Sequence, residues 1–126
     1  MALFYIDGNM KLIQGISLEL KQLFEIQRNF DRKLGWNTYE KCQTNEDLLK
    51  FMEHFVLVMV EELGEISRIR KQYYRDKQDF AVKQFKHELM DIFVYFIQAC
   101  MATDMNLEDE YLEKMKYNEE RFIRKV

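Results

Sequence analysis

Five acidic residues fall within two stretches of sequence that are otherwise apolar. They are Glu61, Glu62, Glu65, Glu88 and Asp91. The first three directly follow the apolar run 56–60, and the last two interrupt an apolar series between residues 85 and 93. At about 100° per residue the first three span about 100° of one helix face, and residues three apart share a face. The spacing therefore predicts two acidic patches on two helices that also carry the core.

Acidic groups that gather in a core need a partner of opposite charge. Like charges at this spacing cost roughly 0.2–0.5 kcal/mol per pair on an exposed helix, and burial raises that cost. A cage of carboxylate oxygens suits hard cations such as Mg²⁺ or Mn²⁺. The alternative is a solvated acidic face, since Glu is a good helix former. Gly64 costs a helix about 1 kcal/mol relative to Ala, which the close approach of another helix or a ligand would justify.

Other metal and nucleophile chemistries fit the sequence less well. A di-iron carboxylate bundle needs a His three residues after a Glu, but Phe51 and Gln84 stand three residues before His54 and His87. Zinc is disfavoured because the sequence has no cluster of His and Cys. No Ser-His-Asp or Cys-His arrangement follows from the spacing, and no glycine-rich phosphate loop is present.

The elements that must position these carboxylates are helices. The sequence has no proline and only four glycines, so helices can run long. Apolar spacings of three and four predict helices over about 17–34, from near Thr44 to 74–77, over about 79–102, and from Asn106 onward. Thr44 and Asn106 are the expected N-caps. We expect an all-α, four-helix-bundle-like domain over residues 16–126, with a loop at 36–43.

The N-terminal segment has a different pattern. Asp7-Gly8 separates two short apolar runs, which predicts a β-hairpin within residues 1–15. The alternative is a frayed terminus. With 126 residues and 15.5 kDa, the whole chain 1–126 is expected to form a single domain.

Composition excludes several classes of partner. The net charge of -3 argues against nucleic acid, and the basic residues Arg68, Arg70, Lys71 and Arg75 are expected to form a solvated face. No apolar stretch is long enough to span a bilayer, and no secretory signal is recognisable. With two cysteines, Cys42 and Cys100, there is no disulfide framework. We therefore expect a cytoplasmic protein without a membrane partner.

The combined acidic pattern resembles the signature of the MazG-like, all-α nucleoside triphosphate pyrophosphohydrolases. The resemblance covers about residues 17–124. It includes an opening helix that contains residues 23–27 and Phe30, and the two acidic motifs. It continues through a turn at residues 103–107 to a last helix that carries basic residues. It implies Mg²⁺-dependent hydrolysis of a nucleoside triphosphate to the monophosphate and pyrophosphate. It also implies a homodimer or homotetramer, because family members pair their helices across subunits.

The resemblance assigns roles by motif. It implies that Glu62, Glu65, Glu88 and Asp91 bind the metal, with Glu61 as a ligand or as support. Glu65 is the expected general base, with Glu62 beside it as a catalytic residue. The expected substrate-binding residues are Gln27, Trp36, Tyr95, Lys114, Asn118 and Arg121.

The sequence also departs from the family's better-known members. Dimeric dUTPases usually carry a Trp-rich segment after the first acidic motif. The corresponding segment of this chain, residues 69–74, contains no Trp. Phosphoribosyl-ATP pyrophosphatases are usually shorter and have no such hairpin. The sequence therefore does not predict which base the substrate carries. A second interpretation is a non-catalytic, oligomeric helical module that binds a cation or a protein partner through its acidic face.

Overall fold

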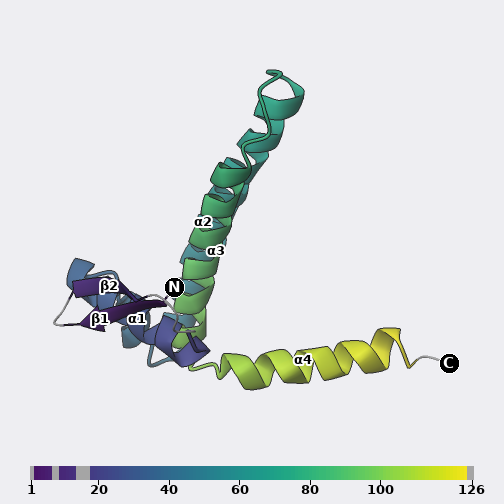
Figure 1. Cartoon of the computed structure of the whole chain (residues 1–126). Helices are drawn as coiled ribbons and strands as arrows, with labels where there is room; N and C mark the ends of the chain where they lie inside the picture. Colours follow the sequence, from purple (N-terminus) through teal and green to yellow (C-terminus); the bar gives the residue numbers. More distant parts are fainter. Residues whose placement is uncertain (1, 7–8, 14–17, 125–126) are drawn as a thin grey trace. The chain divides into compact units, whose positions relative to one another are not determined.

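A computed structural model describes residues 2–6, 9–13 and 18–124 of the chain (Figure 1). Its fold is all-α, as the sequence predicts, with four α-helices and a short N-terminal pair of strands. The chain divides into two compact units. Unit 1 holds residues 1–37 and 104–126, and unit 2 holds residues 38–103.

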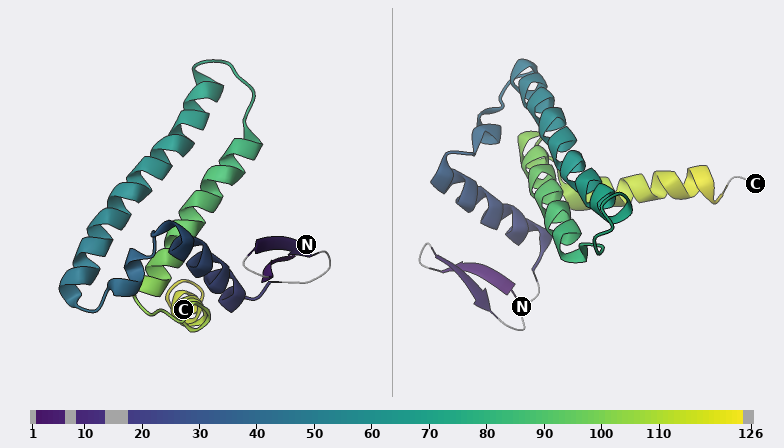
Figure 2. Two further views of the ribbon diagram at one scale, coloured as in Figure 1. Left: turned by 90° about the vertical axis from the view of Figure 1, so that its left-hand side faces the viewer. Right: turned by 90° about the horizontal axis from the view of Figure 1, so that it is seen from above.

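Unit 2 is a helical hairpin with a short 3₁₀ turn in front of it. The turn is η1 (Thr38–Lys41), and the two long helices are α2 (Asn45–Tyr74) and α3 (Val82–Ala102). The helices lie side by side and antiparallel (Figure 2). Where the sequence predicts a loop at 36–43, the structure forms η1, and its Tyr39 is buried while η1 packs against α3.

The start of α2 confirms the predicted cap. The Thr44 hydroxyl accepts from the Asp47 amide at 3.1 Å, and the Asp47 carboxylate accepts from the Thr44 amide at 3.2 Å. These reciprocal bonds satisfy amides that have no partner within the helix. Hydrogen bonds from the Gln43 amide and from Thr44 hold the pKa of Asp47 below its ordinary value. The first turn of α2 is therefore fixed beside η1.

The beginning of α3 differs from the prediction by three residues. The sequence predicts a start near Asp79, but α3 begins at Val82 after the N-cap Ala81. Ala81 has no side chain that could cap the helix, and Lys77 adopts a left-handed conformation with φ 56°. Such a conformation cannot continue a helix. The connection between α2 and α3 is therefore longer than expected, and it carries Phe80.

The packed face of the hairpin follows helical spacing. Val58 and Ile69 on α2 are buried, and so are Ile97, Cys100 and Ala102 on α3. Val58 precedes Glu62 by four residues and Ile69 follows it by seven. Glu62 therefore lies on the apolar face of α2.

Gly64 lies inside α2, where its lack of a side chain has no steric explanation among the described residues. Beyond its chain neighbours and the backbone of its own helix, a Cβ built at Gly64 would meet no described atom within 4 Å. Gly64→Ala should therefore stabilise the protein by about 1 kcal/mol, because Ala favours a helix over Gly by that amount. Urea denaturation measures the change. A destabilised variant would instead show that a second subunit or a ligand approaches this face closely.

Unit 1 contains the predicted hairpin strands. Strands β1 (Ala2–Ile6) and β2 (Asn9–Ile13) pair antiparallel, from Ala2 opposite Ile13 to Ile6 opposite Asn9. The predicted turn residues, Asp7 and Gly8, lie outside the described residues. The strands themselves confirm the hairpin.

The other elements of unit 1 are α1 (Leu20–Leu34) and α4 (Leu107–Phe122). The expected first residue of α1, Ser17, lies outside the described residues. Gly35 ends α1 in the left-handed conformation with φ 72°, and the amides of Gly35 and Trp36 donate to the carbonyls of Arg32 and Asp31. The Asn106 side chain caps α4 by accepting from the Asp109 amide at 3.2 Å, as predicted. Among the described residues, no helix is both long and apolar enough to cross a bilayer.

Candidate metal site

Three of the five predicted carboxylates come together between α2 and α3. Glu62 on α2 and Glu88 and Asp91 on α3 each offer an oxygen, and these oxygens lie within 4.8 Å of one another. Glu88 is buried, with 6% of its surface exposed, and the other two are half-buried. We call these three residues the carboxylate trio. Helical spacing produces it, because Glu88 and Asp91 share a face of α3 and Glu62 lies on the packed face of α2.

All three side chains of the trio are acidic, so their negative charges repel one another. Burial raises the pKa of Glu62, and the neighbouring charges of Asp91 and Glu88 raise it further. A hydrogen bond between the carboxyl groups of Glu62 and Glu88 and the charge of Glu65 act in the same direction. Each of these effects disfavours the ionised form of Glu62. A cation among the three groups would relieve the repulsion.

Two side chains on α3 lie beside the carboxylates of the trio. The Gln84 amide nitrogen donates to Glu88 Oε1 at 2.5 Å, and His87 Nε2 lies 4.0 Å from Asp91 Oδ2. Each neighbour precedes its carboxylate by four residues, so it lies one turn away on the same face. Sequence reasoning missed Gln84 as a positioning residue. Its spacing to Glu88 was the available signal, but a single i,i+4 pair is too common to single out.

Tyr95 lies beside the trio, as its spacing from Asp91 predicts. It is half-buried, and burial raises the pKa of its hydroxyl, followed by the charges of Glu62, Asp91 and Glu61. A raised pKa keeps the hydroxyl protonated near neutral pH. Tyr95 can therefore donate a hydrogen bond at the edge of the site.

The other two predicted carboxylates lie outside the trio. Glu61 and Glu65 are exposed on α2, and the Glu65 carboxylate pairs with Arg68 at 3.6 Å. Glu65 is near enough for its charge to raise the pKa of Glu62. The expected cage of five carboxylates is thus a group of three with two exposed neighbours.

The donor set of the trio fits a hard divalent cation. Carboxylate oxygens are the protein ligands that Mg²⁺ prefers, at about 2.0–2.1 Å from the ion. Two oxygens on opposite sides of such an ion are about 4.2 Å apart, close to the span of the trio. Three carboxylates leave the remaining coordination positions to water or to a phosphate, as is usual for Mg²⁺. The residues present therefore fit the metal that the sequence predicts.

Five of the six predicted substrate-binding residues belong to unit 1, and Tyr95 belongs to unit 2. Gln27 donates to Asp31 Oδ1 at 2.9 Å within α1, and Trp36 packs edge-on against Phe30 with ring centroids 6.1 Å apart. Trp36 thereby supplies the apolar contact that accompanies the C-terminal cap of α1. It keeps 59% of its surface exposed, so a face of the indole stays accessible.

Three further predicted residues follow one face of α4. Lys114, Asn118 and Arg121 are spaced by four and three residues, which places them in a row along the helix. Asn118 is half-buried and the two cations are exposed. The Lys114 ammonium lies 4.9 Å from the centre of the Tyr117 ring, and the Arg121 guanidinium lies 4.9 Å from that of Phe122. This row is a cationic surface that could receive phosphate.

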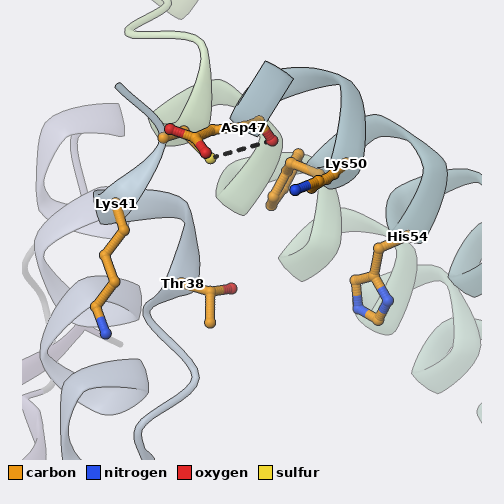
Figure 3. A pocket seen from close by; sticks show the side chains of 7 residues that line it. Thr38, Lys41, Asp47, Lys50 and His54 are labelled. Carbon is orange, nitrogen blue, oxygen red and sulfur yellow. Dashed lines mark hydrogen bonds between the residues drawn. The ribbon is translucent and has the colours of Figure 1, made fainter. Parts of the chain in front are cut away.

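A separate hollow of about 290 Å³ opens where η1 meets the start of α2 (Figure 3). Thr38 and Lys41 on η1 lie across it from Lys50 and His54 on α2, and Phe51 and Cys42 also line it. The Cys42 thiol donates to the Asp47 carbonyl at 3.9 Å, and Lys50 pairs with Glu46 at 3.6 Å. None of the site residues predicted from the sequence lines this hollow.

Comparisons with known proteins add no relative. No protein-family model matches the chain, and neither the curated proteins nor the solved structures give a significant match.

Proposed function

We propose that the chain is a Mg²⁺-dependent nucleoside triphosphate pyrophosphohydrolase of the MazG-like kind. The observation that carries the proposal is the carboxylate trio, whose oxygens lie within 4.8 Å of one another. The same three residues belong to the two acidic motifs on which the resemblance rests. Three carboxylates in a partly buried position are costly without a cation, which supports a metal site over a solvated acidic face.

Each group has a role in this reaction. Glu62, Glu88 and Asp91 hold the ion, and Glu61 supports them from the exposed side of α2. A bound Mg²⁺ would neutralise phosphate charge and acidify a water molecule. Glu65 accepts the proton of the attacking water, from a position next to the trio where Arg68 orients its carboxylate.

The substrate would be held by the remaining predicted residues. Lys114 and Arg121 offset phosphate charge, and Asn118 donates a hydrogen bond to phosphate or sugar. Tyr95 donates from the edge of the trio, and Gln27 and Trp36 stay predicted substrate contacts. The products are a nucleoside monophosphate and pyrophosphate, and the cellular role is control of the nucleotide pool in the cytoplasm.

The test is a pyrophosphate-release assay over the eight common NTPs and dNTPs, with Mg²⁺ or Mn²⁺ and with EDTA. Metal-dependent release of pyrophosphate with at least one nucleotide would support the proposal. Release of orthophosphate alone would contradict it, because cleavage would then occur at the wrong bond. No release with any nucleotide, despite Mg²⁺ binding to the trio, would favour a non-catalytic cation-binding module.

The proposal of a homo-oligomer is supported by a second observation. Five apolar side chains of α2 are exposed along one row: Leu49, Met52, Val56, Val60 and Leu63. Contiguous apolar patches of this kind are often interfaces. We propose that a second copy of the chain covers this row, in a homodimer or in a homotetramer built from such dimers.

The oligomer proposal predicts a change in mass on mutation. Val60→Glu places a charge in the middle of the row and should shift the protein from dimer or tetramer to monomer, as measured by light scattering after gel filtration. Lys50→Glu, on the exposed side of α2 outside the row, is the matched control and should leave the mass unchanged. A wild-type protein that is already monomeric at 100 times the assay concentration would contradict the proposal.

A further inference from the structure

A second pocket lies next to the carboxylate trio, at the end of the hairpin where α2 connects to α3. It has a volume of about 440 Å³. We call it the aromatic pocket. Its lining residues come from the end of α2, the connection and the start of α3; they are Ile66, Ile69, Arg70, Tyr73, Tyr74, Phe80 and Phe85.

The aromatic rings of the pocket form a connected chain. Ring centroids are 5.0 Å apart between Tyr73 and Tyr74, 6.4 Å between Tyr73 and Phe80, and 6.2 Å between Phe80 and Phe85. All three pairs meet edge to face, which is a favoured geometry for aromatic rings. The rings hold one another in place and yet stay open to solvent, since Tyr74 is 62% and Phe80 51% exposed. A preformed set of open ring faces is suited to a flat aromatic ligand.

Arg70 adds a polar group to this apolar lining. Its guanidinium carbon lies 5.1 Å from the centre of the Tyr74 ring. An arginine held over a ring in this way keeps N–H groups at its edge, and they can donate to a carbonyl or ring nitrogen. A ligand that uses both the rings and Arg70 must therefore be flat and must carry hydrogen-bond acceptors. Nucleobases have both properties.

The pocket and the trio share the same stretch of the two helices. Ile66 follows Glu62 by four residues, about 6 Å along the axis, and Phe85 precedes Glu88 by three residues, about 4.5 Å along the axis. Because α2 and α3 are antiparallel, both displacements lead toward the same end of the hairpin (Figure 2). The near end of the pocket, at Ile66 and Phe85, is thus about one turn from the trio, and Tyr73, eleven residues after Glu62, lies about 16.5 Å from it along the axis.

We propose that the aromatic pocket binds the base of the nucleotide, with its phosphates at the trio. This inference rests on the proposed function for its ligand. Tyr73, Tyr74 and Phe80 stack on the base, and Arg70 donates to an acceptor on its edge. Base selectivity is then decided by residues 66–85 of unit 2.

The test measures binding of a product-like nucleotide, so that no turnover is needed. The four deoxynucleoside monophosphates and deoxyribose 5-phosphate, which has no base, are titrated calorimetrically with Mg²⁺ present. We expect at least one nucleotide to bind at least tenfold more tightly than deoxyribose 5-phosphate. Tyr73→Ala should weaken binding of that nucleotide roughly 5- to 150-fold, the range for loss of one base–aromatic stack. Binding of deoxyribose 5-phosphate should change less than twofold.

Two variants separate recognition from folding. Tyr73→Phe keeps the ring and should restore most of the affinity that Tyr73→Ala loses. Leu57→Ala removes another exposed apolar side chain of α2, outside the pocket, and should bind as the wild type does. Equal binding of deoxyribose 5-phosphate and all nucleotides, or wild-type affinity in Tyr73→Ala, would overturn the inference.

The outcome is distinguishable from that of the proposed function. If Tyr73 governs nucleotide affinity but no pyrophosphate is released from any triphosphate, base binding in the aromatic pocket is supported and the proposed reaction is contradicted. If pyrophosphate is released but Tyr73→Ala and Arg70→Gln keep the wild-type preference among bases, the reaction stands and the base binds elsewhere.

Discussion

Asp91→Asn and Glu88→Gln should each lower metal-dependent pyrophosphate release at least about 100-fold. Both changes keep the size of the side chain, but they replace one acceptor oxygen with an N–H donor and remove a negative charge from the trio. A bound metal ion contributes several kcal/mol to a phosphoryl-transfer transition state, and each 1.36 kcal/mol is a factor of ten in rate. The measurement is kcat/KM for the best nucleotide of the panel, with Mg²⁺ varied at each substrate concentration.

The control for this prediction is Glu53→Gln. Glu53 is an exposed carboxylate on α2, outside the trio, so its variant should keep wild-type kcat/KM. Circular dichroism of each variant checks that α2 and α3 still form. If Asp91→Asn is folded and releases pyrophosphate at more than a tenth of the wild-type rate, the trio does not hold the catalytic ion.

Mg²⁺ should raise the melting temperature of the wild-type protein by about 10 °C when its free concentration is 100 times Kd. Binding to the folded state alone contributes about 2.7 kcal/mol at that concentration. For a domain of this size 1 kcal/mol corresponds to a shift of about 4 °C. Differential scanning calorimetry with Mg²⁺, and with EDTA, measures the change. The response should vanish in Asp91→Asn and persist in Glu53→Gln, and a wild-type protein that does not respond would contradict the metal site.

Without metal, the trio should also give stability a pH dependence through Glu62. The pKa of Glu62 lies above its ordinary value of 4.5 in the folded protein, because of burial and the charges of Asp91 and Glu88. Between the unfolded and folded pKa values the folded state binds more protons, so stability falls as pH rises through this window. The penalty is complete above the folded pKa and absent below the unfolded one.

Glu62→Gln removes this penalty because Gln does not titrate. In EDTA the variant should be more stable than the wild type at pH 7, and the difference should shrink toward pH 4. Urea denaturation at several pH values measures it. In Mg²⁺ the order should reverse, since the wild type gains the ion and the variant does not. A variant less stable than the wild type in EDTA at pH 7 would show that Glu62 is not repelled by its neighbours.

The sequence by itself determined the helices and the residues that could bind a metal. Capping residues act locally, so Thr44 and Asn106 mark the starts of α2 and α4 without any tertiary contact. Gly35 ends α1 for an equally local reason, its left-handed conformation. Helical spacing also fixes that Glu88 and Asp91 share a face. These features depend on neighbours three or four residues away, which the sequence shows directly.

Only the tertiary structure decided which carboxylates meet. Glu62 joins Glu88 and Asp91 in the trio, whereas the side chains of Glu61 and Glu65 stay exposed beside it. At about 100° per residue Glu61 lies 100° from Glu62, and Glu65, three residues on, lies only about 60° from it. All three therefore share one broad face of α2, and the sequence alone does not show which carboxylate meets the partner helix. The aromatic pocket has the same origin. Tyr73 and Phe80 are separated by a left-handed turn at Lys77, and their rings meet only because the hairpin folds back there.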